Sequence, residues 1–127
     1  KHKPEFLFEA AQSLSKTGQY EKANEYLERA VLLSSDPMLY YVMAKNEQCL
    51  GEYRQAEKHL LHAIDILPER IYPYYLLMNL YTEPSYFQPA KLKMAIDSVL
   101  TKKPKVESSA IKEMKEKARS MLNNTSI

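Results

Sequence analysis

The chain has 127 residues, of which 45% are hydrophobic and 27% are charged, and its formal net charge is +2 at pH 7. This length and this apolar content suit one folded domain with a modest core better than a disordered tail or two domains. With only 2 glycines against 10 tyrosines and no alternating run bounded by hairpin turns, the sequence disfavours a β architecture. Cys49 is the single cysteine, which excludes an internal disulfide, and we expect it in or near the core.

No stretch of the sequence reaches the roughly 18 apolar residues that a membrane-spanning helix needs. The opening segment, KHKPEFLFEA, turns acidic before the apolar core of a signal peptide could develop. We therefore expect this stretch of chain to be soluble. Whether it is a domain of a larger protein stays open at this point.

An internal repeat organises the first half of the chain. The segment GQYEKANEYLERAV at 18–31 aligns with GEYRQAEKHLLHAI at 51–64, and Phe8 and Ala11 upstream align with Tyr41 and Ala44 at the same offset. The offset is 33 residues at each of the aligned pairs, which are Gly18/Gly51, Tyr20/Tyr53, Ala23/Ala56, Leu27/Leu60 and Ala30/Ala63. The repeating unit is long enough for two helices, and a third copy begins near Ile71.

The second copy shows why each unit is a helical hairpin. Asp36-Pro37 is a typical start, because Asp accepts from free backbone N–H groups and Pro has none to satisfy. A helix follows to about Leu50, and Gly51 supplies the positive-φ residue that ends it. The next helix carries an apolar stripe at spacings of four, three and four, namely Ala56, Leu60, Ala63 and Leu67.

These positions resemble the tetratricopeptide repeat, whose period is about 34 residues. The resemblance covers a first repeat at about 4–36 and a second at about 37–70. A degenerate third repeat at about 71–104 has Ser85 in place of the turn glycine and Asp97 in place of the second small residue. Its second helix is expected from about Phe87 to Leu100, with Phe87, Ala90 and Met94 in the repeat's positions and looser packing around Asp97.

A last helix is predicted at about 108–123, where one arc of the helix is apolar. The residues on this arc are Ile111, Met114, Ala118, Met121 and Leu122. Such a helix would cover the apolar end of the final hairpin. The fold class expected for the whole chain is all-α: one domain at 1–127, a right-handed superhelical α-solenoid of three hairpins plus a C-terminal capping helix.

Two histidines one helical turn apart raise the question of a metal site. His59 and His62 fall beside the buried Leu60 and Ala63, so we expect both on the outer face of their helix and without partners. A zinc site needs three or four ligands, and no Cys or third His has a suitable spacing. No nucleophile stands in a recognisable turn, and there is no glycine-rich phosphate loop. We expect no metal, no cofactor and no enzymatic activity.

The first helices of the three hairpins would line an inner groove, as the resemblance implies. The groove residues are expected to be Phe8, Gln12, Tyr41, Lys45, Gln48, Tyr72, Tyr75 and Asn79. Tyrosine offers a large contact area and a hydroxyl group, which binding surfaces favour. Each ring could equally pack on the neighbouring helix instead of facing a ligand. The groove predicts a protein or peptide partner.

The end of the chain is basic and suggests an alternative. Residues 91–127 hold nine Lys or Arg against four Asp or Glu, a net of +5, whereas residues 1–90 have nine against twelve, a net of −3. Lys112, Lys115 and Arg119 share one flank of the last helix and could face an anionic membrane or a nucleic acid. No aromatic residues interleave with them, so nucleic acid is the less expected of the two. An ordinary solvated face is the simpler explanation.

The second half of the chain carries a narrower resemblance. PERIYPYYLLMNLY and KKPKVESSAIKEMKEKARSML are similar to the repeat-containing tail that follows the membrane part of bacterial O-antigen ligase or polymerase family proteins, over about residues 37–122. The resemblance implies a bacterial soluble domain tethered at the inner membrane, on the cytoplasmic or the periplasmic side. The chemistry of surface polysaccharide assembly would then lie in the membrane part.

Together these patterns predict a non-catalytic scaffold that binds a peptide or partner segment in its groove. The alternative is a module whose basic end binds an anionic surface. The identity of the partner, the membrane side and the oligomeric state stay open.

Overall fold

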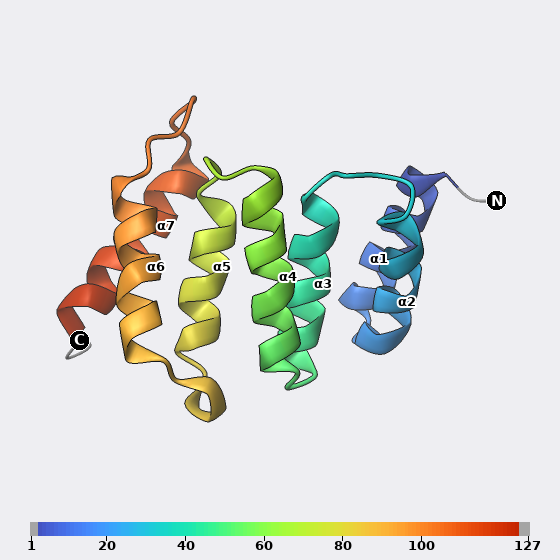
Figure 1. The fold of residues 1–127 in the computed structure, drawn as a ribbon, viewed down its shortest axis with the longest axis horizontal. Helices are drawn as coiled ribbons and strands as arrows, with labels where there is room; N and C mark the ends of the chain where they lie inside the picture. The colour runs from blue at the N-terminus through green and yellow to red at the C-terminus, as the bar shows by residue number, and fades with distance from the viewer. Residues whose placement is uncertain (1–2, 125–127) are drawn as a thin grey trace. The chain divides into compact units, whose positions relative to one another are not determined.

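The structure is a computed structural model that describes residues 3–124 (Figure 1). These residues form seven α-helices and one 3₁₀ helix, with no β-strand among them, which confirms the all-α prediction. Contacts group the chain into two compact units, Lys1–Leu67 (unit 1) and Pro68–Ile127 (unit 2). The single domain at 1–127 stays a prediction. Within the described part of the chain, no helix combines the length and the apolar character needed to cross a membrane.

Unit 1 consists of two helical hairpins. The first pairs α1 (Pro4–Lys16) with α2 (Tyr20–Ala30), and the second pairs α3 (Met38–Cys49) with α4 (Tyr53–Ile66). Helices α2 and α3 also pack on each other, which joins the hairpins.

Both hairpins turn at a glycine, as the sequence predicts. Gly18 has a φ of 81° and Gly51 a φ of 78°, which are the only positive φ values in the described chain. The residue after each glycine donates its backbone N–H to the carbonyl five residues earlier, at 2.9 Å in the first turn and 2.8 Å in the second. This is the bond that closes a helix C-terminus around a left-handed residue.

The predicted cap of the second hairpin is also confirmed. Oδ1 of Asp36 accepts a hydrogen bond from the backbone N–H of Met38 at 3.0 Å. The carboxylate therefore satisfies one of the donors that the first turn of α3 leaves free.

The core of unit 1 consists of leucines with alanines between them. Ala56 and Ala63 are 1% and 0% exposed, as predicted from the repeat. The other buried side chains around the first hairpin are Leu7, Ala11, Ala23, Leu27, Ala30, Leu39 and Met43. Alanines at these positions let the helix backbones approach closely, because a larger side chain would hold them apart.

A buried polar chain crosses three helices of unit 1, and sequence reasoning missed it. Ser15 Oγ on α1 donates to Asn46 Oδ1 on α3 at 2.8 Å. Asn46 Nδ2 donates to Asn24 Oδ1 on α2 at 2.8 Å, and Asn24 Nδ2 donates to the Met43 carbonyl at 3.2 Å. Because Asn24 and Asn46 are buried, these bonds fix the positions of α1, α2 and α3.

Unit 2 contains the third hairpin and the last helix. Helix α5 (Tyr72–Tyr81) leads through the short 3₁₀ helix η1 (Pro84–Tyr86) to α6 (Pro89–Thr101) and then α7 (Ser109–Asn124). Helix α6 packs on α5, and α7 packs mainly on α6 (Figure 1).

The predicted register of the third hairpin is wrong by two residues. Helix α6 begins at Pro89 instead of Phe87, and Phe87 and Met94 are 49% and 69% exposed. The buried face of α6 is Leu92, Ala95, Ile96 and Val99. The offset from α4 to α6 is 36 residues, as the pairs Ala56/Leu92, Leu60/Ile96 and Ala63/Val99 show. This offset is longer than the 33 residues between the first two repeats, because η1 lengthens the turn. Val99 therefore takes the position assigned to Asp97, and Asp97 is exposed.

The capping helix is confirmed within one residue of its predicted bounds. Ser108 Oγ accepts from the backbone N–H of Ile111 at 3.2 Å and so caps the start of α7. The predicted apolar arc faces inward, with Ala118 buried and Ile111, Met114, Met121 and Leu122 half-buried.

Candidate interaction surfaces

Unit 1 contributes five of the predicted groove residues, on α1 and α3. Gln12 and Lys45 are exposed, Gln48 is half-buried, and Phe8 packs partly buried against the core. Tyr41 is only 5% exposed. Its ring is therefore packed inside the protein, which is the alternative that the sequence left open for each ring. Whether the five residues bind a ligand stays a prediction.

Unit 2 contributes three groove residues, which lie on one stripe of α5. Tyr72, Tyr75 and Asn79 are spaced by three and four residues, and all three are half-buried. The rings of Tyr72 and Tyr75 stack with their centroids 6.4 Å apart. Nζ of Lys117, on α7, lies 5.6 Å from the Tyr75 centroid, within the range of a cation–π contact.

Asn79 adds a feature that the sequence does not reveal. Its Oδ1 atom is buried and accepts no hydrogen bond from the described residues. An amide oxygen without a donor costs free energy in the folded state. We use the name α5 stripe for the three α5 residues Tyr72, Tyr75 and Asn79 together with Lys117, which reaches them from α7. Sequence reasoning missed Lys117, because nothing in its spacing indicates that α7 reaches the side chains of α5.

The structure corrects the placement of one histidine. Nδ1 of His59 lies 2.8 Å from Oε1 of Glu47, a buried residue of α3, and the His59 side chain is only 17% exposed. His59 therefore has a partner that ties α4 to α3. His62 is exposed as predicted, but its ring meets that of Tyr40 edge-on at 4.6 Å. No group of three or more His, Cys, Asp or Glu that could hold a metal ion occurs among the described residues.

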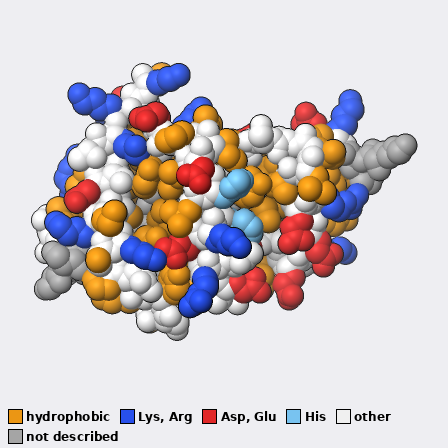
Figure 2. Space-filling model, viewed as in Figure 1, with side chains coloured by type: hydrophobic (Ala, Val, Ile, Leu, Met, Phe, Trp, Pro, Cys, Tyr) orange, Lys and Arg blue, Asp and Glu red, His pale blue; other side chains and the backbone are white. Residues whose placement is uncertain are grey.

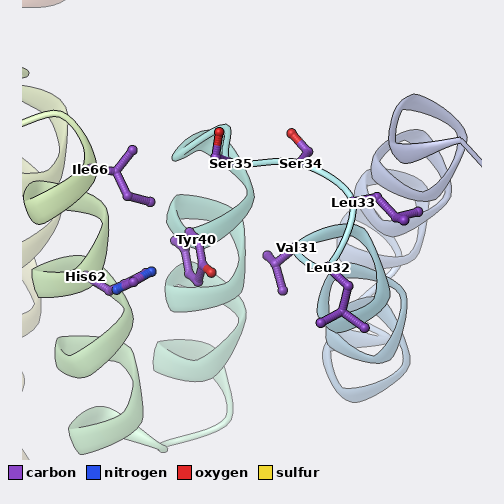
Figure 3. Close-up of a pocket in the computed structure, with 8 residues that line it drawn as sticks. All are labelled: Val31, Leu32, Leu33, Ser34, Ser35, Tyr40, His62 and Ile66. Atoms are coloured by element: carbon purple, nitrogen blue, oxygen red, sulfur yellow. The ribbon is translucent and has the colours of Figure 1, made fainter.

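An open cleft lies beside His62, and the sequence reasoning did not find it (Figure 3). Its volume is about 480 Å³. Figure 3 shows Val31 pointing towards Tyr40, with His62 approaching from α4. The lining residues belong to the end of α2, the connection to α3, and α3 and α4, and they are Val31, Leu32, Leu33, Ser34, Ser35, Tyr40, His62 and Ile66. We call this feature the unit 1 cleft.

The three predicted basic residues of α7 differ in their surroundings. Lys112 and Arg119 are exposed. Lys115 is half-buried, and its Nζ donates to the carbonyls of Val99, Leu100 and Lys102 at 2.8, 3.2 and 3.0 Å. Lys115 therefore satisfies the free carbonyls at the end of α6 and, unlike Lys112 and Arg119, is not an exposed member of the basic flank.

Cys49 is exposed, so the prediction that it lies in or near the core is wrong. It ends α3, where the second hairpin turns. A hydrogen bond to the Cys49 side chain, with its charge and slight burial as smaller causes, raises the pKa of Tyr20 above its ordinary value.

Comparisons with a family model and with solved structures show which known fold the chain has. Residues 4–37 match the family model of the tetratricopeptide repeat. The chain is similar to the type III secretion translocator chaperone SycD of Yersinia enterocolitica, solved with a peptide of the translocator YopD, with a TM-score of 0.81, 16% identity, and 94% of this chain and 88% of that chain covered. It is also similar to the Sgt2 TPR domain from Aspergillus fumigatus, with a TM-score of 0.74, 15% identity, and 94% and 79% covered. No curated protein matches the chain in sequence.

The first hairpin thus matches the tetratricopeptide repeat, and the fold is that of a tetratricopeptide-like α-solenoid. At 15–16% identity the structural likenesses show the fold alone.

Proposed function

We propose that the chain is a non-catalytic interaction module that binds an extended peptide or a partner segment along the first helices of its hairpins. The fold supports this proposal, because solenoids of helical hairpins expose long surfaces for partners. SycD, which has this fold, was solved in complex with a peptide of the translocator YopD, so a protein with this fold can bind a peptide.

The observation that carries the proposal is the α5 stripe. Two stacked half-buried tyrosines provide apolar area with hydroxyl groups at its edge. Asn79 Oδ1 accepts no hydrogen bond from the described residues, so a donor from a bound segment would relieve the cost of this unsatisfied oxygen. Lys117 adds a positive charge, which favours a segment with an acidic residue near this point.

Selection from a random-peptide display library against the folded chain tests the proposal. A selected peptide should bind Tyr75→Ala and Asn79→Ala about 2 kcal/mol more weakly, while circular dichroism and melting show both variants folded. Lys112→Ala, which changes an exposed lysine of α7, is the matched control and should bind normally. If every selected peptide bound the two α5 variants as well as it binds the wild type, the proposal would be wrong.

A basic surface formed by Lys112 and Arg119 is the second candidate function, because both side chains are exposed on α7. It would bind an anionic membrane more readily than a nucleic acid. Binding to vesicles that contain phosphatidylserine should then fall steeply with salt, whereas binding at the α5 stripe should change little.

The sequence resemblance of PERIYPYYLL and KVESSA supports a finer context for the same module. In this context the chain is the soluble tail of a bacterial membrane protein of O-antigen assembly. The tail is tethered at the inner membrane, on its cytoplasmic or its periplasmic side. Several apolar spans of about 20 residues upstream of Lys1 in the gene would support this context, and a soluble neighbouring domain would remove it.

A further inference from the structure

The loop between α6 and α7 is fixed at its base. Helix α6 ends at Thr101, and α7 begins at Ser109. Nζ of Lys115, on α7, donates to three carbonyls at the end of α6, and Nζ of Lys102 lies 5.1 Å from the ring centroid of Tyr74 on α5. The base of the loop therefore contacts all three α-helices of unit 2, and these contacts set the direction in which the loop leaves them.

The tip of this loop, residues 103–106, stands clear of the helices, and we call it the loop tip. The loop projects beyond the ends of α6 and α7 (Figure 1), and basic side chains stand out at the projection in the space-filling view (Figure 2). Val106 is 75% exposed, and Lys103 and Lys105 are exposed and form no ion pair with the described residues. Pro104 between the two lysines restricts the backbone, so the tip loses less conformational entropy when it binds.

The charge around the loop tip is positive. Residues 102–112 hold four Lys against one Glu, a net of +3. The one acidic residue, Glu107, follows Val106 and is exposed. Lysines close to an anionic surface are attracted to it, and the attraction grows with their number. The loop tip therefore favours a negatively charged partner.

The exposed Val106 decides which negatively charged partner fits best. A bilayer has an apolar layer directly beneath its headgroups, so lysines that meet anionic headgroups bring Val106 to a place where its side chain leaves water. A nucleic-acid backbone would contact the lysines only, and the loop tip has no aromatic ring to stack on bases. An acidic protein would need a socket shaped for a projecting valine, whereas a fluid bilayer needs none. The chemistry of the loop tip thus matches an anionic membrane surface.

We propose that the loop tip docks on an anionic membrane, with Val106 at the level of the headgroups and Lys103 and Lys105 facing the charged groups of the lipids. This contact rests on the second candidate function, binding to an anionic membrane, and names a segment other than Lys112 and Arg119 that reaches the lipid. One valine and a few lysines give weak and reversible attachment. Binding therefore falls steeply as salt screens the charges.

A single tryptophan at the loop tip tests the proposal, because the chain has no Trp of its own. Val106→Trp changes an exposed side chain, and its emission should shift to shorter wavelength on phosphatidylcholine vesicles that contain about 30% phosphatidylserine. Vesicles of phosphatidylcholine alone should cause no shift. Met94→Trp, at a 69% exposed position of α6, is the matched control, and its emission should stay that of a tryptophan in water.

Charge reversal separates the loop tip from α7. Lys103→Glu combined with Lys105→Glu should raise the lipid concentration needed for half-maximal binding by about tenfold or more, measured by co-sedimentation with the same vesicles. Lys112→Glu combined with Arg119→Glu changes the net charge by the same amount and should raise it by less than about threefold. Circular dichroism checks that all variants are folded.

The outcomes distinguish a failure of the loop tip from a failure of membrane binding itself. If the wild type bound the vesicles but the Val106→Trp emission did not shift, or if the α7 pair lost as much binding as the loop pair, the loop-tip proposal would be wrong and the second candidate function would survive. A wild type that stayed unbound at low salt and about 10 mM lipid would overturn both. A single-stranded oligonucleotide that bound the loop tip more tightly than the vesicles do would also overturn the proposal. Peptide binding at the α5 stripe is measured without lipid and is independent of these results.

Discussion

Unit 1 and unit 2 are both built from helical hairpins, but they turn and pack by different means. In unit 1 each hairpin turns at a positive-φ glycine, and alanines occupy the closest contacts between helices. In unit 2 helix α5 ends without a glycine, and the hydroxyl of Thr82 donates to the Asn79 carbonyl at 2.7 Å. The buried face of α6 carries Ile96 and Val99 where α4 has Leu60 and Ala63. A helical hairpin thus needs a continuous apolar face and a first helix whose last carbonyl groups accept hydrogen bonds. Different residue types meet these two requirements in the two units.

The largest expected effect tests the corrected register of unit 2. Ile96 is fully buried on α6, so Ile96→Ala should lower the free energy of unfolding by about 2–5 kcal/mol through lost contacts and a cavity. Met94, two residues earlier, is exposed, and Met94→Ala should change it by less than about 0.5 kcal/mol. Urea denaturation of both variants measures the difference. If Met94→Ala lowered the free energy of unfolding more than Ile96→Ala, Met94 would be the buried residue, as in the register predicted from the sequence.

A second substitution tests the close helix contact of unit 1. Ala63 is 0% exposed, and Ala63→Leu should overpack the interface and destabilise the chain by about 1–3 kcal/mol. Val99→Leu at the matching position of α6 adds only one methylene and should cost less. Thermal melting of both variants gives the comparison, and equal losses would show that the α6 contact is the tighter one, because fewer added atoms would cause the same loss.

The turn glycines give a third, smaller difference between the units. A Cβ built on Gly51 would meet no atom within 4 Å, so the cost of Gly51→Ala comes from the backbone alone. At a φ of 78° this cost should be about 1–2 kcal/mol. Thr82→Ala at the turn of unit 2 removes one exposed hydroxyl bond and should cost about 0.5 kcal/mol. Chemical denaturation can separate these values, and a neutral Gly51→Ala would contradict the conformational argument.

The sequence predicted the fold well wherever one local pattern decided the structure. The 33-residue offset identified both hairpins of unit 1, their turns and their buried alanines, because each of these depends on a few neighbouring residues. The register of α6 failed because Pro84, Ser85 and Pro89 do not show by themselves how many residues the 3₁₀ turn takes up. Spacing copied from the first two repeats could not supply that number.

The candidate site was less predictable, because it depends on contacts between distant residues. Spacing placed Tyr41 on the same face as Tyr75, but only the packing of whole helices shows that Tyr41 is buried and Tyr75 half-buried. The contact between Lys117 and Tyr75 spans 42 positions of the sequence, and no local pattern signals it. The unit 1 cleft likewise needs the connection after α2 to lie opposite α4.

The smallest expected effect separates the two histidines of α4. His59 contacts Glu47, a residue with only 6% of its side chain exposed, so His59→Gln should weaken a bond to a buried carboxylate and cost about 0.5–1.5 kcal/mol. His62 is exposed and its ring meets that of Tyr40 edge-on, so His62→Gln should cost less than about 0.5 kcal/mol. Melting at pH 7 with and without zinc measures both effects. Zinc should raise neither melting temperature, because no third ligand accompanies the histidines in the described residues. If zinc raised the melting temperature of the wild type in a saturable way, and this rise disappeared when both histidines were changed to Gln, the pair would bind metal.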